Sequence, residues 1–203
     1  MPMYGLPAST LINQPLYKKV VYEKFNLKKV ERERFDADIS KMALVARISP
    51  ATVPALAEGQ EIKGFYVLQV TLKHQEYDVK NILLLQKLIP QQIVYALQFE
   101  ELTQLCVFHT RLQQSDWRNT ESTEIPLTGL TLDEVWENIV AVIGSLDAQA
   151  EESIEEQILN REQQEKLLRQ IETLEKRART EKQTRKKYEL HQQIMKLKEE
   201  VGI

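Results

Sequence analysis

Hydrophobic and polar positions give their clearest structural signal in the middle of the chain. Side chains alternate in type along Phe65 to Leu72, which is typical of a half-buried strand. The next segment, Asp78 to Ile89, is apolar nearly all round and is followed by Pro90, so it predicts a buried helix. Two further strand-like runs, Ile93 to Phe99 and Leu105 to Thr110, complete a predicted β-α-β-β unit.

Helical spacing dominates the segments on either side of this unit. Residues 28–47 carry apolar side chains at intervals of four, three and four, which predicts a helix ended by Ser49-Pro50; these side chains are Phe35, Ile39, Met42 and Ala46. Residues 16–25 fit either a strand or a helix, and the chain before residue 15 is expected to be extended. Thr131 and Glu134 have the spacing of a capping box, and the helix they open carries an apolar stripe of Val135, Ile139, Val142 and Leu146.

The C-terminal segment predicts a long exposed helix, because neither glycine nor proline occurs between Gly144 and Gly202. It contains two apolar seams with coiled-coil spacing, formed by Leu167, Ile171, Leu174 and Ala178 and by Leu190, Ile194, Leu197 and Val201. The seams are two residues out of register, an offset that neither a stutter nor a stammer supplies. Either they face different directions on one helix, which the lack of Gly, Pro and Asn favours, or residues 179–187 contain a turn.

These seams need an apolar partner, which could come from the same fold, a second copy or another protein. The residues predicted to bind it are Ile171, Leu174, Leu190, Ile194, Leu197 and Val201. Protein–protein contact or self-association through the C-terminal helix is therefore the expected use of this segment.

Composition places the core in the first part of the chain. The 203 residues carry 27 basic and 30 acidic side chains, and all aromatic residues except Tyr188 precede residue 150. We expect an α+β domain at residues 1–146, followed by a long, charged, coiled-coil-like helical extension at residues 147–203. One cysteine excludes an intramolecular disulfide. With no signal-like N-terminus and no long apolar run, the sequence predicts a cytoplasmic protein that does not associate with membranes.

Familiar catalytic patterns are missing from the sequence. The three histidines and the single cysteine are scattered, so no zinc-binding spacing occurs, and neither glycine-rich phosphate-binding motif is present. The sequence therefore predicts no metal and no cofactor.

A metal-dependent nuclease remains the alternative, because such enzymes place an acid-x-Lys triplet on a strand. Here the triplet is Thr71-Leu72-Lys73, and an acid would have to come from Asp36, Asp38 or Glu61. The simpler interpretation is that Lys73 ends an exposed strand while Asp36 and Asp38 lie on the solvated side of a helix. His109 with Arg111 could bind a phosphate or a carboxylate, although a solvated pair is the simpler interpretation.

Residues 176–187 form a basic block with a local formal charge of +6. Its seven basic residues are Lys176, Arg177, Arg179, Lys182, Arg185, Lys186 and Lys187. On an exposed helix they could neutralise nucleic-acid phosphates and release counterions. The simpler interpretation is the solvated part of a coiled coil, since no aromatic stacking platform is evident and the preceding segment, residues 151–156, is acidic.

Several short motifs together resemble a known family. They are Leu6-Pro7-Ala8-Ser9-Thr10-Leu11-Ile12-Asn13, Arg47-Ile48-Ser49-Pro50-Ala51-Thr52, the strand entry from Ile89-Pro90 to Leu97, and the segment from Glu181 to Leu190. They resemble an uncharacterised bacterial family, domain-of-unknown-function family 4391, over essentially the whole chain. The resemblance implies no assigned reaction. It does imply a genomic neighbourhood of DNA methyltransferases and helicases in restriction or phage-defence islands, and hence a helicase or methyltransferase partner.

Two hypotheses follow. The first is a non-enzymatic adaptor or accessory subunit that makes protein contacts, and contacts DNA through the basic block, in a restriction-modification or phage-defence assembly. The second is a divergent metal-dependent nuclease that uses Lys73 with an acid from elsewhere in the chain.

Overall fold

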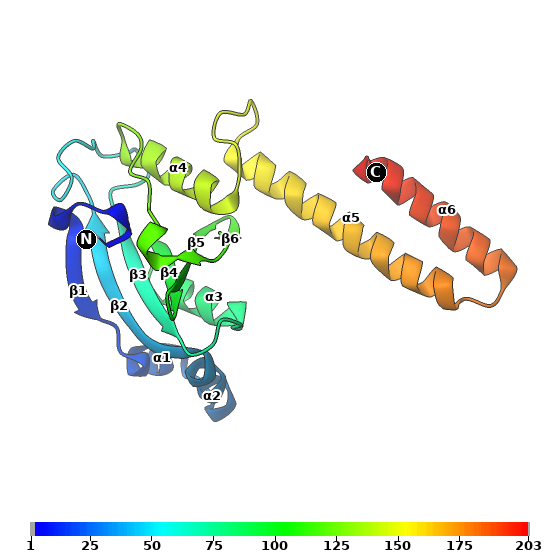
Figure 1. Cartoon of the computed structure of the whole chain (residues 1–203), viewed down its shortest axis with the longest axis horizontal. Helices are drawn as coiled ribbons and strands as arrows, with labels where there is room; N and C mark the ends of the chain where they lie inside the picture. The colour runs from blue at the N-terminus through cyan, green and yellow to red at the C-terminus, as the bar shows by residue number, and fades with distance from the viewer. Residues whose placement is uncertain (1–2, 203) are drawn as a thin grey trace. The chain divides into compact units, whose positions relative to one another are not determined.

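The computed structural model describes residues 3–202. The chain divides into two compact units, residues 1–150 and residues 151–203, which Figure 1 shows as an α+β body and a pair of helices. None of the helices within residues 3–202 combines the length and the apolarity that crossing a bilayer requires.

A seven-stranded sheet forms the centre of the first unit. Its strands are β1 (Leu11–Pro15), β2 (Ile39–Ile48), β3 (Phe65–Leu72), β4 (Gln92–Phe99), β5 (Leu102–His109), β6 (Arg111–Gln114) and β7 (Arg118–Asn119). The order is β1-β2-β3-β4-β5-β6, and β7 pairs with β5. β3 and β4 are parallel, which requires the crossover through a helix that α3 supplies, and every other pair is antiparallel.

Helices pack on both faces of the sheet (Figure 1). They are α1 (Lys18–Phe25), α2 (Lys29–Asp38), α3 (Val79–Leu88) and α4 (Leu132–Gly144), with short 3₁₀ turns η1 (Met3–Gly5), η2 (Ala8–Thr10) and η3 (Thr120–Ser122). On one face Val21, Phe35 and Ile82 share a core with strand residues such as Leu68. On the other face Trp136 of α4 packs against Phe65, with ring centroids 5.4 Å apart. The mixed α+β class predicted from the sequence is confirmed.

The helix predicted over residues 28–47 is wrong in its second half. α2 ends at Asp38, and residues 39–48 form the strand β2. The ladder between β2 and β3 is irregular: Ile39 pairs with Leu72 but Met42 pairs with Val70, so β2 holds one extra residue in this interval. Because of this β-bulge, Ile39 and Met42 lie on the same face of β2 although they are three residues apart. In the sequence, this spacing has the same form as that of a helix.

Two predicted burial patterns are also corrected by the structure. β3 is not half-buried, because α4 covers the face that Phe65 and Val67 present while α3 covers the other. The stripe predicted for α4 is displaced, since Val142 is 53% exposed whereas Trp136, Val140 and Ile143 are buried. The start of α4 is as predicted, because the Thr131 hydroxyl accepts a hydrogen bond from the Glu134 amide at 3.3 Å. Residues 16–25, compatible with strand or helix, contain α1.

The C-terminal unit is a helical hairpin and not one long helix. α5 (Ile154–Thr180) and α6 (Thr184–Val201) are separated by residues 181–183, so the turn in residues 179–187, the less favoured of the two interpretations, is the one observed. Glu181 (ψ 125°) and Gln183 (ψ 114°) adopt extended backbone angles, and Glu181 accepts a hydrogen bond from the Gln183 amide at 2.9 Å. Extended conformations suit any residue type, so the break needs no glycine or proline.

Candidate nucleic-acid interface

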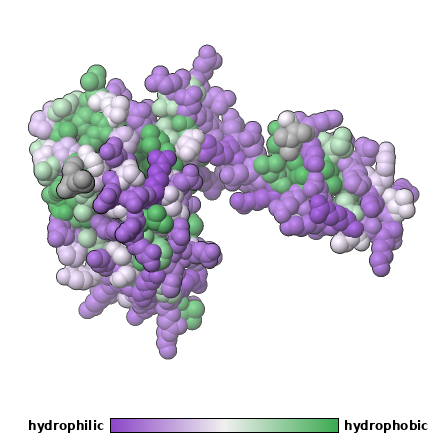
Figure 2. All heavy atoms as spheres, viewed as in Figure 1, coloured by the Kyte–Doolittle hydropathy of each residue, from purple (hydrophilic) through white to green (hydrophobic). Residues whose placement is uncertain are grey.

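The hairpin is held together by the two apolar seams, which face each other. Ile171, Ala178 and Ile194 are buried between the helices, and Leu174, Leu190, Leu197 and Val201 pack around them. Figure 2 shows one hydrophobic patch on this unit, which is otherwise mostly hydrophilic on the face in view. All six predicted partner-binding residues therefore lie inside the hairpin, and the apolar partner that each seam needs is the other seam.

Electrostatic contacts at the ends of the helices add to this packing. α5 begins with a capping box between Ser153 and Glu156, in which the Ser153 amide donates to Glu156 at 2.9 Å. Lys198 of α6 donates to Glu175 of α5 at 2.9 Å, and this hydrogen bond lowers the pKa of the Glu175 carboxyl. α6 ends at Gly202, whose φ of +80° glycine adopts readily. The hairpin is thus a defined scaffold for the residues at its turn.

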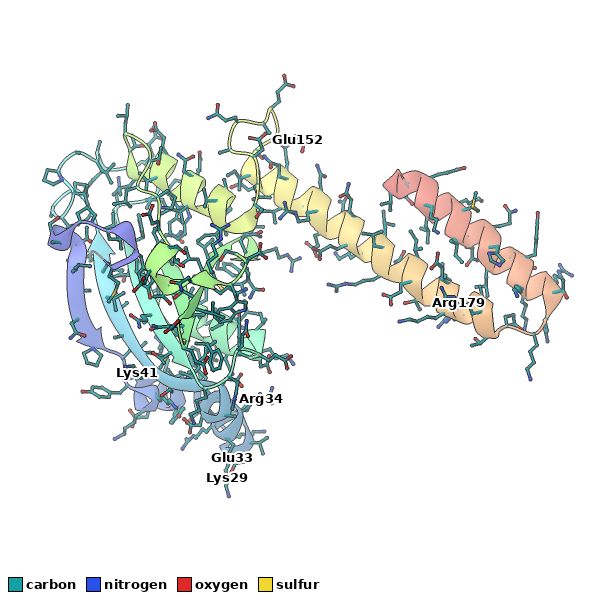
Figure 3. All side chains as sticks on the ribbon, viewed as in Figure 1. Lys29, Glu33, Arg34, Lys41, Glu152 and Arg179 are labelled. Atoms are coloured by element: carbon teal, nitrogen blue, oxygen red, sulfur yellow. The ribbon has the colours of Figure 1, made fainter. Side chains whose placement is uncertain are left out.

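The turn collects the whole basic block. We define the tip as residues 176–187 and the stem as residues 151–175. The tip comprises the last turns of α5, the connection and the first turn of α6, so residues spread over twelve positions of sequence converge at one end of the hairpin. Figure 3 shows Arg179 near the C-terminal end of α5. The continuous helix expected from the sequence would instead have spread these charges along its axis.

Most of the basic side chains at the tip are left without a counter-charge. Lys176 pairs with Glu172 at 2.7 Å and Arg185 pairs with Glu189 at 3.3 Å, and both pairs are exposed. Arg179 attracts the carboxylate of Glu175 and lowers its pKa. Within residues 3–202 the other four make no ion pair; they are Arg177, Lys182, Lys186 and Lys187. The single acid of the tip, Glu181, already accepts the Gln183 amide. The tip therefore presents a net positive surface to solvent.

Two shallow grooves run along opposite sides of the hairpin near its tip. The first, of about 680 Å³, is lined by Arg177, Lys182 and Lys186, together with polar neighbours that include Thr180 and Gln193. The second, of about 420 Å³, is lined by Arg179, Lys187 and Lys198, with His191 and Met195. Acids line the grooves too, Glu181 and Glu189 in the first and Glu175 in the second, but basic side chains outnumber them in each. A phosphate chain passing across the tip therefore meets a net positive charge on both sides.

Tyr188 is a candidate contact that the sequence interpretation did not include. It follows the basic block directly, its ring is 64% exposed, and its hydroxyl accepts a hydrogen bond from Gln192 at 3.0 Å. An exposed aromatic ring beside basic residues can stack on an unpaired base. The signal was present in the sequence, since Tyr188 is the only aromatic residue of the C-terminal segment.

The structure places the residues considered for nuclease chemistry in different surroundings; they are Lys73, Asp36, Asp38 and Glu61. Lys73 lies beside α2, where its amine donates to the backbone carbonyl of Asp36. The Asp36 carboxylate accepts hydrogen bonds from Lys18 at 2.7 Å and from the Tyr22 hydroxyl at 2.5 Å. Burial alone would raise the pKa of Asp36, but these two bonds outweigh it and lower the pKa. Both partners belong to α1, so this part-exposed carboxylate links α2 to α1.

Asp38 is not on a solvated helix face, as the sequence interpretation placed it. Its carboxylate is half-buried and accepts hydrogen bonds from the Asp78 amide at 2.8 Å and from the Asn81 side chain at 2.7 Å, which fixes the start of α3. Glu61 lies before the first residue of β3, and Lys73 follows the last, so a strand of about 25 Å separates them. Among residues 3–202, no group of three or more His, Cys, Asp or Glu side chains is placed to hold a metal ion.

His109 and Arg111 face each other across the tight turn between β5 and β6, where Thr110 has a φ of +58°. Neither residue is without an interaction partner. Cys106 is buried in β5, and burial raises the pKa of its thiol to about 12, so it is not an accessible thiolate. Neither feature resembles a catalytic site.

Comparison with known proteins gives one match. A family model described as a domain of unknown function, DUF4391, matches residues 4–201, which is nearly the whole chain. No curated protein and no solved structure matches the chain.

Proposed function

Since this chain belongs to the DUF4391 family, whose description names no reaction, we propose its role from its own surface. The protein is a non-enzymatic accessory subunit, and the tip of its α5–α6 hairpin binds the phosphate backbone of nucleic acid. The body supports the hairpin and contacts the other members of the assembly.

One observation carries this proposal: seven basic residues converge at the turn, and four of them (Arg177, Lys182, Lys186 and Lys187) have no carboxylate partner within residues 3–202. Unpaired cations held close together repel one another and lower the stability of the isolated protein. Phosphates relieve this repulsion and release their condensed counterions on binding. A binding role accounts for a cluster that folding alone disfavours.

The chemistry of the tip indicates binding without sequence discrimination. Lysine and arginine contacts to phosphates position a protein on nucleic acid but do not distinguish bases. The exposed ring of Tyr188 favours single-stranded over double-stranded substrates, because only unpaired bases can stack on it. The coiled-coil-like α5–α6 hairpin would then place its tip against single strands of nucleic acid that a partner enzyme has separated.

The partners that we propose are a helicase or a methyltransferase of a restriction or phage-defence assembly. This part rests on the family and on no contact described above. Affinity capture of the native protein from its own cells tests it directly, with identification of the proteins that co-purify. Recovery of the protein alone, under mild salt, would contradict an accessory role.

The test of the tip is a salt titration of nucleic-acid binding with matched variants. The tip variant combines Lys182→Gln, Lys186→Gln and Lys187→Gln; the control combines Lys19→Gln, Lys24→Gln and Lys29→Gln on α1 and α2, an equal change of charge. Each phosphate contact contributes about 0.9 to the slope of log K against log salt for duplex DNA and about 0.7 for single strands. The tip variant should therefore lower the slope by about 2 to 3, and the control should leave it unchanged. Equal slopes for the two variants would exclude the tip as the phosphate-binding surface.

The divergent nuclease remains the second candidate, and the observation that favours it is the position of Lys73 beside Asp36. It predicts cleavage of DNA in the presence of Mg²⁺ or Mn²⁺ and loss of cleavage in Lys73→Ala. Cleavage by the parent and the variant at the same rate would remove this candidate. The carboxylates of Asp36 and Asp38 already hold other side chains and amides, and for that reason we place it second.

A further inference from the structure

The α5–α6 hairpin has a strongly uneven distribution of charge. The stem, residues 151–175, contains eight acidic and three basic residues, a formal charge of −5. The tip, residues 176–187, has a formal charge of +6. Figure 3 shows Glu152 before the start of α5 and Arg179 near its far end. At 1.5 Å per residue these two positions are about 40 Å apart, so opposite charges occupy opposite ends of one rod.

One side of this rod also exposes large apolar side chains. Met195 is 58% exposed and lines the same groove as Glu175 and Arg179. Leu168, which is 44% exposed, precedes Glu175 by two helical turns and so lies on the same side. Tyr188 precedes Met195 by the same interval. The side opposite, along the groove of Arg177 and Gln193, is polar near the tip.

We propose that a second copy of the chain packs antiparallel against this side of the hairpin, with the tip of each copy beside the stem of the other. Charge complementarity selects this occupant and this orientation. In the antiparallel pair both tips meet an acidic stem, whereas in a parallel pair the two tips meet each other and repel. Leu168 and Met195 become buried between the two hairpins, which form a bundle of four helices.

The second copy also explains a weakness of the isolated hairpin. Two helices bury only Ile171, Ala178 and Ile194 between them, a small core for a unit of this length. A second pair of helices would cover the exposed apolar side and enlarge that core. The dimer does not require nucleic-acid binding, but both use the tip, so a phosphate chain and the stem of the second copy compete for it.

The decisive experiment is sedimentation of the full chain with paired charge reversals. The tip reversal combines Lys182→Glu, Lys186→Glu and Lys187→Glu, and the stem reversal combines Glu151→Lys, Glu152→Lys and Glu165→Lys. The parent should be a dimer that weakens on the order of tenfold or more between about 0.1 M and about 1 M salt, because the screening length falls from about 10 Å to about 3 Å. Each reversal alone should weaken the dimer at least as much.

Mixing the two reversed proteins should restore association, because the mixed dimer keeps one junction between a basic tip and an acidic stem. Circular dichroism checks that each variant retains its helices. A monomeric parent at low salt, or a mixture that associates no better than its components, would overturn the proposal. Met195→Glu should weaken the dimer, and Gln193→Glu on the opposite side should not. Equal effects of the two substitutions would show that the side carrying Met195 is not the dimer interface.

This design separates the dimer from the proposed nucleic-acid role. The stem reversal leaves the basic residues of the tip intact, so it should abolish dimerisation and retain binding to a single-stranded oligonucleotide. If the parent dimerises and binds no oligonucleotide, the proposed function fails while the dimer stands. If the parent binds the oligonucleotide but is a monomer at low salt, the dimer proposal fails while the proposed function stands.

Discussion

The two units of this protein use their charged residues in different ways. In the body, several charged groups have partners: on α2, Lys29 pairs with Glu33 at 3.8 Å, and Arg34 pairs at 3.4 Å with Asp78, which caps α3 (Figure 3). Asp133 goes further, because its carboxylate accepts hydrogen bonds from the amides of residues 60–62. At the hairpin tip, four cations have no such partner within the described chain.

This difference separates charges that maintain the fold from charges that are available for binding. A carboxylate that accepts two or three hydrogen bonds is already engaged in the fold, so Asp36, Asp38 and Asp133 are poor candidates for catalysis. Unpaired cations grouped at a rigid turn have no structural use of that kind. Function is therefore better sought at the tip than in the body.

The largest expected effect is in the body. Phe65→Ala removes a fully buried ring that packs on Trp136, so it should lower the free energy of unfolding of the body by about 3–5 kcal/mol. Urea denaturation followed by tryptophan fluorescence measures this change. Val142→Ala, at an exposed position of α4, is the control and should have little effect. A small loss for Phe65→Ala would show that this face of the sheet is not a packed core.

The next largest effect is in the hairpin. Ile194→Ala removes a buried side chain from the seam and should cost about 2–4 kcal/mol. Because the seam is small, we expect the two helices to separate and fray while the body remains folded. Hydrogen exchange by residue measures this directly. Gln193→Ala, at an exposed position of α6, is the control, and loss of protection in both units together would contradict independent behaviour.

A smaller effect follows from the pH dependence of the body. Hydrogen bonds from the amides of Ile62, Gln60 and Glu61 hold the pKa of Asp133 below its usual value. Its ionised carboxylate therefore stabilises the fold above the unfolded-state pKa of about 3.9, and this stabilisation is lost as the pH falls through the lower folded-state pKa.

Urea midpoints measured as the pH falls below about 4 test this expectation. Asp133→Asn should reduce both the stability at neutral pH and its loss in acid. Asp116→Asn is the control, because Asp116 is exposed and its side chain caps no backbone amide in the described chain. Identical acid profiles for the parent and Asp133→Asn would contradict the assignment.

The smallest effect on stability should come from the tip. Neutralising Lys182, Lys186 and Lys187 removes no ion pair within the described chain, so the free energy of unfolding should change by less than about 0.5 kcal/mol. Relief of repulsion makes a slight gain more probable than a loss. Thermal denaturation of the tip variant and the α1–α2 control measures the difference. A large loss would mean that these cations hold the hairpin together.

The sequence predicted most of the helices and strands in which the apolar residues keep a regular spacing. β3, α3 and the beginning of α4 lie where alternation, a continuous apolar run and a capping box place them. β1 lies at the end of the segment that was expected to be extended. β2 was missed because a bulge changes its hydrophobic spacing, and β6 and β7 were missed because strands of two to four residues are too short to display one. The sequence identified all seven basic residues of the candidate site, but it did not predict that they lie together at the tip of a hairpin.

What the sequence determined by itself was composition within each segment: where the core lies, which residues are basic, and that two apolar seams exist two residues out of register. Only the tertiary structure decided that the seams pack against each other. Local propensity favours an unbroken helix through residues 181–183, but breaking it forfeits only a few hydrogen bonds, and these exchange with water at small net loss. Bringing the seams together removes Ile171, Leu174, Ile194 and Leu197 from water, and a contact between residues so distant in sequence leaves no mark in any local pattern.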